Sequence, residues 1–110
     1  MKEQTIQKQI LDKLEALGHY NIKIITGNRA GQSDIISCSP TGRFWAIEVK
    51  KPGEVPSDLQ WDHIRQVQAC NGIAFYCDSL DDFLFKYKKC AVFETNCFEP
   101  PAPQETFVDL

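Results

Sequence analysis

The chain of 110 residues has the size and composition of one globular domain. Hydrophobic residues make up 43% of it and charged residues 25%, values that exclude a mostly disordered or collagen-like chain. Twelve Lys and Arg against fifteen Asp and Glu give a net charge of −3. A uniformly basic nucleic-acid coat protein is therefore excluded, and DNA contact would require a local basic patch or a bound cation. No apolar run spans a bilayer and no secretory signal begins the chain, so we expect a soluble cytoplasmic protein without membrane contact.

The cysteine and histidine content argues against a zinc site or a disulfide framework. The chain has five cysteines and two histidines, and no two cysteines form a CxxC arrangement. We therefore expect reduced thiols, several of them small core residues, at Cys38, Cys70, Cys77, Cys90 and Cys97.

The first half of the chain predicts one helix followed by three strands. Apolar residues recur at helical spacing from about residue 3, and Gly18 ends this helix. Segments rich in β-branched and apolar residues predict strands over 21–26, 33–38 and 43–51. The third of these is mostly apolar and is therefore expected at the centre of a sheet.

The second half predicts two helices around a fourth strand. Ser57 and Gln60 have the spacing of a capping box, so a helix should begin there and run to about residue 70. Residues 73–77 predict a short buried strand, and a last helix should run from 80 to about 89. The order α-β-β-β-α-β-α predicts an α/β fold with a mixed β-sheet flanked by helices.

We divide the chain into a domain over residues 1–90 and an irregular C-terminal extension over 91–110. The extension includes the Pro-rich run 100–103. It is expected to pack on the domain or on a partner.

The most specific feature is a group of charged residues on the central hairpin. If the turn pairs Cys38 with Phe44, the antiparallel register places Asp34 opposite Glu48, with Cβ atoms about 4.5–5.5 Å apart. Lys50 stands two residues beyond Glu48 and therefore shares its face. Two carboxylates and one ammonium group then meet in one place, whereas a slip of one residue would scatter them.

Two opposed carboxylates on a buried hairpin are costly unless a cation joins them. Like charges directly opposed destabilise a hairpin, and burial of an unpaired carboxylate costs free energy or shifts its pKa. Mg²⁺ takes one or two protein carboxylates and keeps several waters. We therefore predict a Mg²⁺ or Mn²⁺ site, because both cations accept these ligands. A lysine beside such a site can bind a phosphate oxygen and stabilise charge in a transition state.

Simpler interpretations of the same residues stay open. Glu48 and Lys50 can form a same-face ion pair, and Asp34 can simply begin a strand after a Gly-containing loop. Gln60 can serve only as the third residue of the capping box. Glu3 can be a solvated acid that the helix dipole favours.

In their order and spacing these residues resemble the VRR-NUC family, small nucleases of the PD-(D/E)XK restriction-endonuclease-like superfamily. The resemblance covers about residues 3–87, and one departure is Ser33, which stands where the superfamily motif has proline. The matching positions are Glu3 with Ile6, Ile10 and Leu14, then Gly31 to Ile36, Ile47 to Lys50, Ser57 with Gln60, Gly72 to Phe75, and Ser79 with Asp82 and Phe83.

The resemblance implies a metal site and a catalytic lysine. Asp34 and Glu48 would bind the metal together with the backbone carbonyl of Val49. Lys50 would contact the scissile phosphate and help to orient or activate the attacking water. Metal chemistry of this kind activates water and neutralises charge in an in-line displacement. Similar nucleases leave 5′-phosphate and 3′-hydroxyl ends.

Two further residues have accessory roles in the same resemblance. Gln60 would be the polar residue of the helix that follows the catalytic strand. Glu3 would be an acid of the first helix that acts through water or a second metal.

The resulting hypothesis is a metal-dependent DNA endonuclease. Similar stand-alone proteins occur in phages and bacteria and act as homodimers on branched DNA such as four-way (Holliday) junctions, which are intermediates of DNA repair. We expect the same substrate class and assembly here, in a bacterial cell or a phage-infected host. We expect four basic residues near the Asp34, Glu48 and Lys50 group to contact the DNA: Arg29, Arg43, Lys51 and Arg65.

Two other functions stay open. A catalytically silent DNA- or protein-binding module could retain the fold, although the opposed acids would then have little purpose. A structural interaction domain could use the Pro-rich tail to dock a partner, which deletion of residues 99–110 would test.

Overall fold

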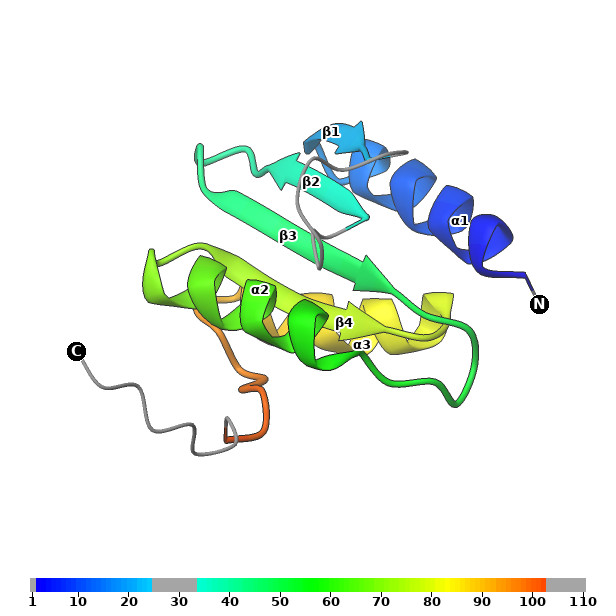
Figure 1. The fold of residues 1–110 in the computed structure, drawn as a ribbon. Coiled ribbons are helices and arrows are strands. Elements are labelled where there is room, and N and C mark those ends of the chain that lie inside the picture. Colours follow the sequence, from blue (N-terminus) through cyan, green and yellow to red (C-terminus); the bar gives the residue numbers. More distant parts are fainter. Residues whose placement is uncertain (1, 25–33, 103–110) are drawn as a thin grey trace.

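The computed structural model describes residues 2–24 and 34–102 and arranges them as a four-stranded sheet with helices on both faces (Figure 1). In chain order the elements have the predicted α-β-β-β-α-β-α sequence. Among the described residues, no helix is long and apolar enough to cross a membrane. The bounds are α1 (Glu3–Ala16), β1 (Tyr20–Lys23), β2 (Ile35–Cys38), β3 (Phe44–Val49), α2 (Asp58–Ala69), β4 (Ile73–Cys77) and α3 (Leu80–Ala91).

The sheet is mixed, as predicted. The strands lie in the order β1-β2-β3-β4, with antiparallel pairing from β1 to β3 and parallel pairing between β3 and β4. Parallel neighbours need a crossover connection, and α2 supplies it. This connection brings the carboxyl ends of β3 and β4 to the same edge of the sheet (Figure 1).

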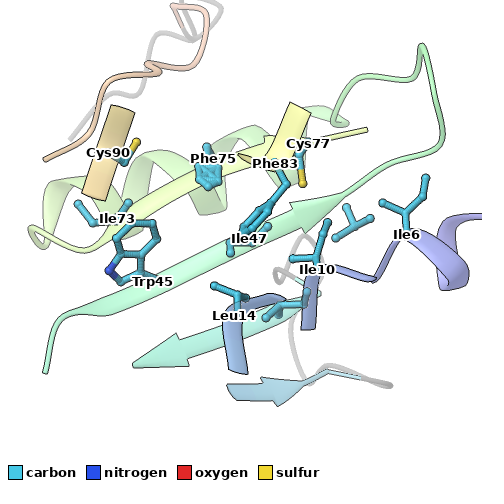
Figure 2. Close-up of a cluster of buried hydrophobic side chains, with 12 residues drawn as sticks. Ile6, Ile10, Leu14, Trp45, Ile47, Ile73, Phe75, Cys77, Phe83 and Cys90 are labelled. Atoms are coloured by element: carbon cyan, nitrogen blue, oxygen red, sulfur yellow. The ribbon is translucent and has the colours of Figure 1, made fainter. Parts of the chain in front are cut away.

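Most of the large apolar side chains lie between the sheet and the helices α1 and α3 (Figure 2). Ile6, Ile10 and Leu14 project from α1 at the predicted spacing and are fully buried. Trp45 and Phe75 come from neighbouring strands and meet edge to face, with ring centres 6.3 Å apart. Burying each side chain of this size contributes roughly 1.5–3 kcal/mol. All five cysteines are free thiols, and two of them belong to this core.

Helix α2 covers the opposite face of the sheet over β3 and β4. The short side chains of Ala46 and Ala74 leave room for the buried Ile64 of α2. Trp61 packs edge to face against Tyr76, with ring centres 5.3 Å apart. Small sheet residues therefore allow α2 to approach closely, and Trp61 is a packing residue on this side.

The central strand is shorter than the apolar pattern predicts, whereas β4 has its predicted bounds. The central strand loses its last two predicted residues because Pro52 has no N–H and the chain turns at Gly53, whose φ is +83°. Lys50 still pairs through its N–H with the Cys77 carbonyl oxygen at 2.9 Å. Positions 25, 26 and 33 of the other predicted strands lie outside the described residues.

Residues 92–102 follow α3 without a regular element and pack along the outer edge of β4. Asn96 Oδ1 accepts the Ala74 N–H at 2.9 Å, and Asn96 Nδ2 donates to the Gly72 carbonyl oxygen at 2.8 Å. Gln68 of α2 donates to the Ala74 carbonyl oxygen at 2.9 Å. Side chains therefore form hydrogen bonds with the backbone groups at this edge, to which an added strand would otherwise bind.

Candidate functional site

The central hairpin has the predicted register, in which Cys38 pairs with Phe44 across antiparallel β2 and β3. Asp34 directly precedes β2, and its Oδ2 accepts the Val49 N–H at 2.8 Å. The Asp34 carboxylate therefore lies beside the end of β3 that carries Glu48.

Glu48 is a buried carboxyl group at this end of β3. It is 2% exposed, and its Oε1 accepts a hydrogen bond from Gln60 Nε2 at 2.7 Å. Its Oε2 is buried and receives no hydrogen bond from an N–H or hydroxyl donor in the described part of the chain. Burial, next the negative charge of Asp34 and then a hydrogen bond with the Asp34 carboxyl group raise the pKa of Glu48 from 4.5 to about 9, while Lys50 acts in the opposite direction. The group is therefore costly to ionise without a cation beside it.

The side-chain amide of Gln60 has both of the roles that the sequence left as alternatives. Its Oε1 accepts the Ser57 N–H at 2.9 Å, and Ser57 Oγ accepts the Gln60 N–H at 3.3 Å, which completes a capping box at the start of α2. Its Nε2 donates to Glu48. The helix terminus thus holds the amide that orients the Glu48 carboxyl group.

Lys50 lies on the other side of the same amide. Its Nζ donates to Gln60 Oε1 at 3.4 Å, and its side chain is partly exposed. Its position is set by the backbone bond to Cys77, which continues the parallel pairing one residue beyond β3. The ammonium group and the Glu48 carboxyl group therefore share one neighbour, Gln60.

Glu3 stands in the first turn of α1, within electrostatic range of this group. Burial, and next the negative charge of Asp34, raises the pKa of Glu3, whereas Lys50 lowers it. No hydrogen bond joins Glu3 to Asp34, Glu48 or Lys50 within residues 2–24 and 34–102. Of the five predicted catalytic residues, four are joined through hydrogen bonds or the hairpin, and Glu3 lies at their periphery.

A sequence profile of the VRR-NUC domain matches residues 1–81, most of the chain. The protein belongs to the VRR-NUC family. One relative, "Putative nuclease p44" of Acyrthosiphon pisum secondary endosymbiont phage 1, is 26% identical over 81 residues, which are 74% of this chain and 87% of that protein. A solved structure described as "VRR_NUC domain" superposes with a TM-score of 0.67 at 24% identity and covers 83% of this chain and 95% of that one. The structural likeness shows that the two chains share a fold, and the family match supports a nuclease.

The donor set of this VRR-NUC site fits a divalent cation. Asp34 and Glu48 supply carboxylate oxygens, and Glu48 Oε2 is a buried oxygen with no N–H or hydroxyl donor among the described residues. The Val49 N–H points toward Asp34. In a β-strand the N–H and the carbonyl of one residue point to the same side of the strand, so the Val49 carbonyl oxygen also lies on the Asp34 side. No group of three or more His, Cys, Asp and Glu side chains in the described ranges is placed to hold a metal ion. Two carboxylates meet the usual protein requirement of Mg²⁺, which retains several waters.

Of the predicted DNA contacts within the described ranges, the VRR-NUC fold brings Lys51 to the site. Lys51 follows Lys50, is exposed, and is close enough to lower the pKa of Glu3. Arg43 lies at the opposite end of β3, where its guanidinium group donates to the Asn71 carbonyl oxygen. The prediction that Arg43 lies near the site is therefore wrong. Arg43 precedes the first residue of β3, whereas the site lies at the last residues of that strand.

Arg65 is not at the site either. The guanidinium group of Arg65 contacts the Asp62 carboxylate and donates to the Pro101 carbonyl oxygen at 2.6 Å. Arg65 therefore holds the C-terminal segment against α2 in this structure. Arg29 lies outside the described residues.

Sequence reasoning missed Asp78, which directly follows β4. Its Oδ2 accepts the Gly53 N–H at 3.0 Å and so joins the end of β4 to the loop between β3 and α2. In the sequence Asp78 stands directly before the helix cap Ser79, and Asp followed by Ser is common in ordinary turns. The signal that would have found it is the parallel pairing of β3 with β4, which places both carboxyl ends at one edge.

Proposed function

We propose that this VRR-NUC protein is a metal-dependent DNA endonuclease of the PD-(D/E)XK type. The observation that carries the proposal is the state of Glu48, a buried carboxyl group that faces the Asp34 carboxyl group and has one oxygen with no N–H or hydroxyl donor among the described residues. Such a group destabilises a protein without a cation, and a bound cation offsets that cost. A fold that served only as a scaffold would be more stable with an apolar residue at this position.

Asp34, Glu48 and the backbone carbonyl of Val49 would hold the cation, Mg²⁺ or Mn²⁺. Both carboxylates are fixed by neighbours, Asp34 by the Val49 N–H and Glu48 by Gln60. The chemistry that a bound cation supplies to phosphodiester hydrolysis is activation of a water molecule and neutralisation of charge on the phosphate.

The remaining residues act on the DNA and on the geometry of the site. The Lys50 ammonium group contacts the scissile phosphate and stabilises the negative charge that develops there. Gln60 keeps that ammonium group and the Glu48 carboxyl group on opposite ends of its amide. Glu3 acts from the periphery through a water molecule, and Lys51 contacts the phosphate backbone of the DNA.

We propose branched DNA as the preferred substrate and a homodimer as the active assembly. A chain of 110 residues offers little surface for selecting a DNA structure, and two copies would supply paired cuts. Three large apolar side chains on one face of the β1–β3 ribbon support self-association, since Tyr20 is 73%, Ile22 49% and Phe44 47% exposed. A second copy of the chain would cover these side chains and remove their apolar surface from water.

The test is cleavage of end-labelled single-stranded, duplex, flap and four-way-junction DNA in Mg²⁺, Mn²⁺ or EDTA. Wild type is expected to cut only with metal and fastest on branched DNA, and Lys50→Ala is expected to lose the activity. Light scattering of the same preparations is expected to give the mass of a dimer. A folded protein that binds these DNAs and cuts none of them with either metal would be a silent binding module, and the nuclease proposal would fail. Equal rates on all DNAs, or a monomer at the assay concentration, would overturn the substrate or the assembly separately.

A further inference from the structure

The loop between β3 and α2, residues 50–57, sets the distance between two groups of the site. Lys50 begins the loop, and Ser57 ends it with the cap bonds that hold Gln60. The residues from Lys51 to Val55 are all exposed, so apolar packing does little to fix their conformation. The conformation of this tip therefore depends on hydrogen bonds.

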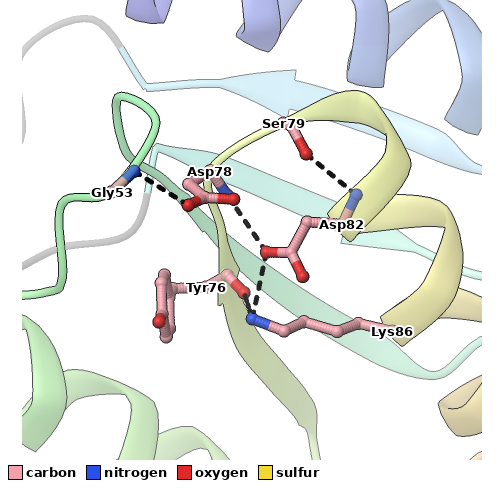
Figure 3. Close-up of polar contacts among 6 residues, drawn as sticks. All are labelled: Gly53, Tyr76, Asp78, Ser79, Asp82 and Lys86. Atoms are coloured by element: carbon pink, nitrogen blue, oxygen red, sulfur yellow. Dashed lines mark hydrogen bonds and ion pairs between the residues drawn. The ribbon is translucent and has the colours of Figure 1, made fainter.

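Asp78 supplies such a bond from another part of the chain. Its Oδ2 accepts the Gly53 N–H at 3.0 Å, as Figure 3 shows. Gly53 has a φ of +83°, in the left-handed region, and the next N–H, that of Glu54, donates to the Lys51 carbonyl oxygen at 3.0 Å. The Asp78 carboxylate thus contacts the centre of the turn through which the loop reverses direction.

Asp78 is itself anchored by the start of α3. Its backbone N–H donates to Asp82 Oδ2 at 3.1 Å, and Asp82 pairs with Lys86 at 3.2 Å. Lys86 Nζ also donates to the Tyr76 carbonyl oxygen at 2.7 Å and lies 3.9 Å from the centre of the Tyr76 ring. Figure 3 shows these contacts as one chain from α3 across the end of β4 to the loop. The backbone of Asp78, whose carboxylate contacts Gly53, is therefore held in place by Asp82 and Lys86.

We propose that Asp78 is a positioning residue of the nuclease site, where its carboxylate clamps the loop at Gly53 and so keeps Lys50 in reach of Gln60. The inference rests on the proposed nuclease function and adds to it a residue that contacts neither metal nor DNA. The Lys50 backbone is held by its bond to Cys77, so a looser loop would let the start of α2, and with it Gln60, move relative to Lys50. The contact at 3.4 Å between Lys50 Nζ and Gln60 Oε1 is long enough that small displacements break it.

The test compares three variants by NMR without metal or DNA and by cleavage kinetics with metal. Asp78→Ala removes the acceptor for Gly53, whereas Asp78→Asn keeps an oxygen at the same position. Asp81→Ala is the matched control, because Asp81 is an exposed acid in the first turn of α3. Each variant is first shown by thermal unfolding to be folded at the assay temperature.

In Asp78→Ala, the Gly53 amide is expected to exchange about two- to tenfold faster, and kcat to fall by about the same factor, as loss of one hydrogen bond implies. The side-chain amide resonances of Gln60 are expected to shift, with KM for DNA close to that of wild type. Asp78→Asn is expected to restore all three readouts, and Asp81→Ala to leave them unchanged.

Gln60 resonances and kcat equal to those of wild type in Asp78→Ala would overturn the proposal, even if Gly53 exchanges faster. Failure of Asp78→Asn to restore the readouts would overturn it as well, because the charge rather than the clamp would then matter. If wild type cuts no DNA, the proposed nuclease function fails by itself. The NMR comparison still decides whether Asp78 positions Gln60.

Discussion

Gln60 Nε2 donates to Glu48 Oε1 at 2.7 Å while the oxygen of the same amide caps helix α2. The bond couples a helix terminus to a buried carboxyl group on the central strand. It means that the orientation of Glu48 depends on where α2 begins, and that a single substitution at Gln60 affects the helix and the site together.

Gln60→Ala and Ser57→Ala separate the two roles of this amide. Each variant loses part of the capping box, so each is expected to lose about 0.5–2 kcal/mol of unfolding free energy. Only Gln60→Ala removes a neighbour of Glu48 and Lys50, so only that variant is expected to cleave DNA about tenfold more slowly. Urea unfolding and metal-dependent cleavage measured on both variants check this. Equal losses of activity in the two variants would show that the cap alone matters.

Glu48→Gln is expected to stabilise the protein in EDTA at high pH. The pKa of Glu48 lies at about 9 in the folded protein, above its ordinary value of 4.5. The contribution of Glu48 to the free energy of unfolding is therefore fully present below about pH 4.5 and is lost as the pH rises through 9. The glutamine of the variant stays neutral, so its contribution does not change with pH. The advantage of the variant is expected to grow with pH by at most about 1.4 kcal/mol per unit.

Urea unfolding of both proteins at pH 5, 7 and 9 measures this difference. Added Mg²⁺ is expected to raise the unfolding free energy of wild type and not of Glu48→Gln, because the cation binds only the folded wild type. A pH-independent difference between the two proteins would contradict the account of Glu48.

A buried network around His19 gives the fold a second pH dependence. His19 is 6% exposed, its Nδ1 lies 2.8 Å from Ser37 Oγ, and its Nε2 lies 2.9 Å from the Tyr87 hydroxyl. Ser37 Oγ donates to Asn21 Oδ1 at 2.6 Å, so Ser37 accepts from His19 Nδ1 and the Tyr87 hydroxyl donates to Nε2. The network is therefore complete with a neutral imidazole.

Acid is expected to weaken this network. Burial lowers the pKa of His19 below 6.5, although the charge of Glu94 acts in the opposite direction. A lowered pKa means that the stabilisation is present above about pH 6.5 and is lost as the pH falls below it. Thermal unfolding between pH 7.5 and 5 is expected to show a steeper loss for wild type than for His19→Gln. Parallel curves would exclude His19 as the cause.

Asn96→Ala is expected to destabilise the domain through the edge of β4. The variant leaves the Ala74 N–H and the Gly72 carbonyl oxygen without their partner, at a cost of about 1–3 kcal/mol. Asn96→Asp keeps the acceptor and loses the donor, so an intermediate loss is expected. Unchanged melting temperatures for both would show that the two Asn96 hydrogen bonds contribute nothing to the stability of the domain.

The sequence was sufficient for the hairpin and its acids because a strand alternates its side chains strictly. Once Cys38 and Phe44 were paired, the face of Asp34 and Glu48 followed without further information. For Gln60 the sequence left two roles open, a residue of the capping box and a polar residue of the site. A side-chain amide carries a donor and an acceptor, and the structure uses both.

The position of Arg43 was wrong for a reason visible in the sequence. A residue seven positions before Lys50 on one extended strand lies at the other end of that strand. Asp78 could not be found in the same way. Its contact with Gly53 depends on β4 being the parallel neighbour of β3, and pattern alone does not fix which strands are neighbours.

The most direct test of the nuclease site is cleavage of a four-way junction by wild type, Asp34→Asn and the control Asp12→Asn, each in Mg²⁺ and in EDTA. Asp12 is an exposed acid of α1 whose ion pair with Lys8 contributes little. Wild type and Asp12→Asn are expected to cut at similar rates in Mg²⁺ and not in EDTA. Asp34→Asn is expected to be at least about a hundredfold slower, as loss of a metal ligand implies. An Asp34→Asn variant that cuts as fast as wild type would show that the site is not the one described.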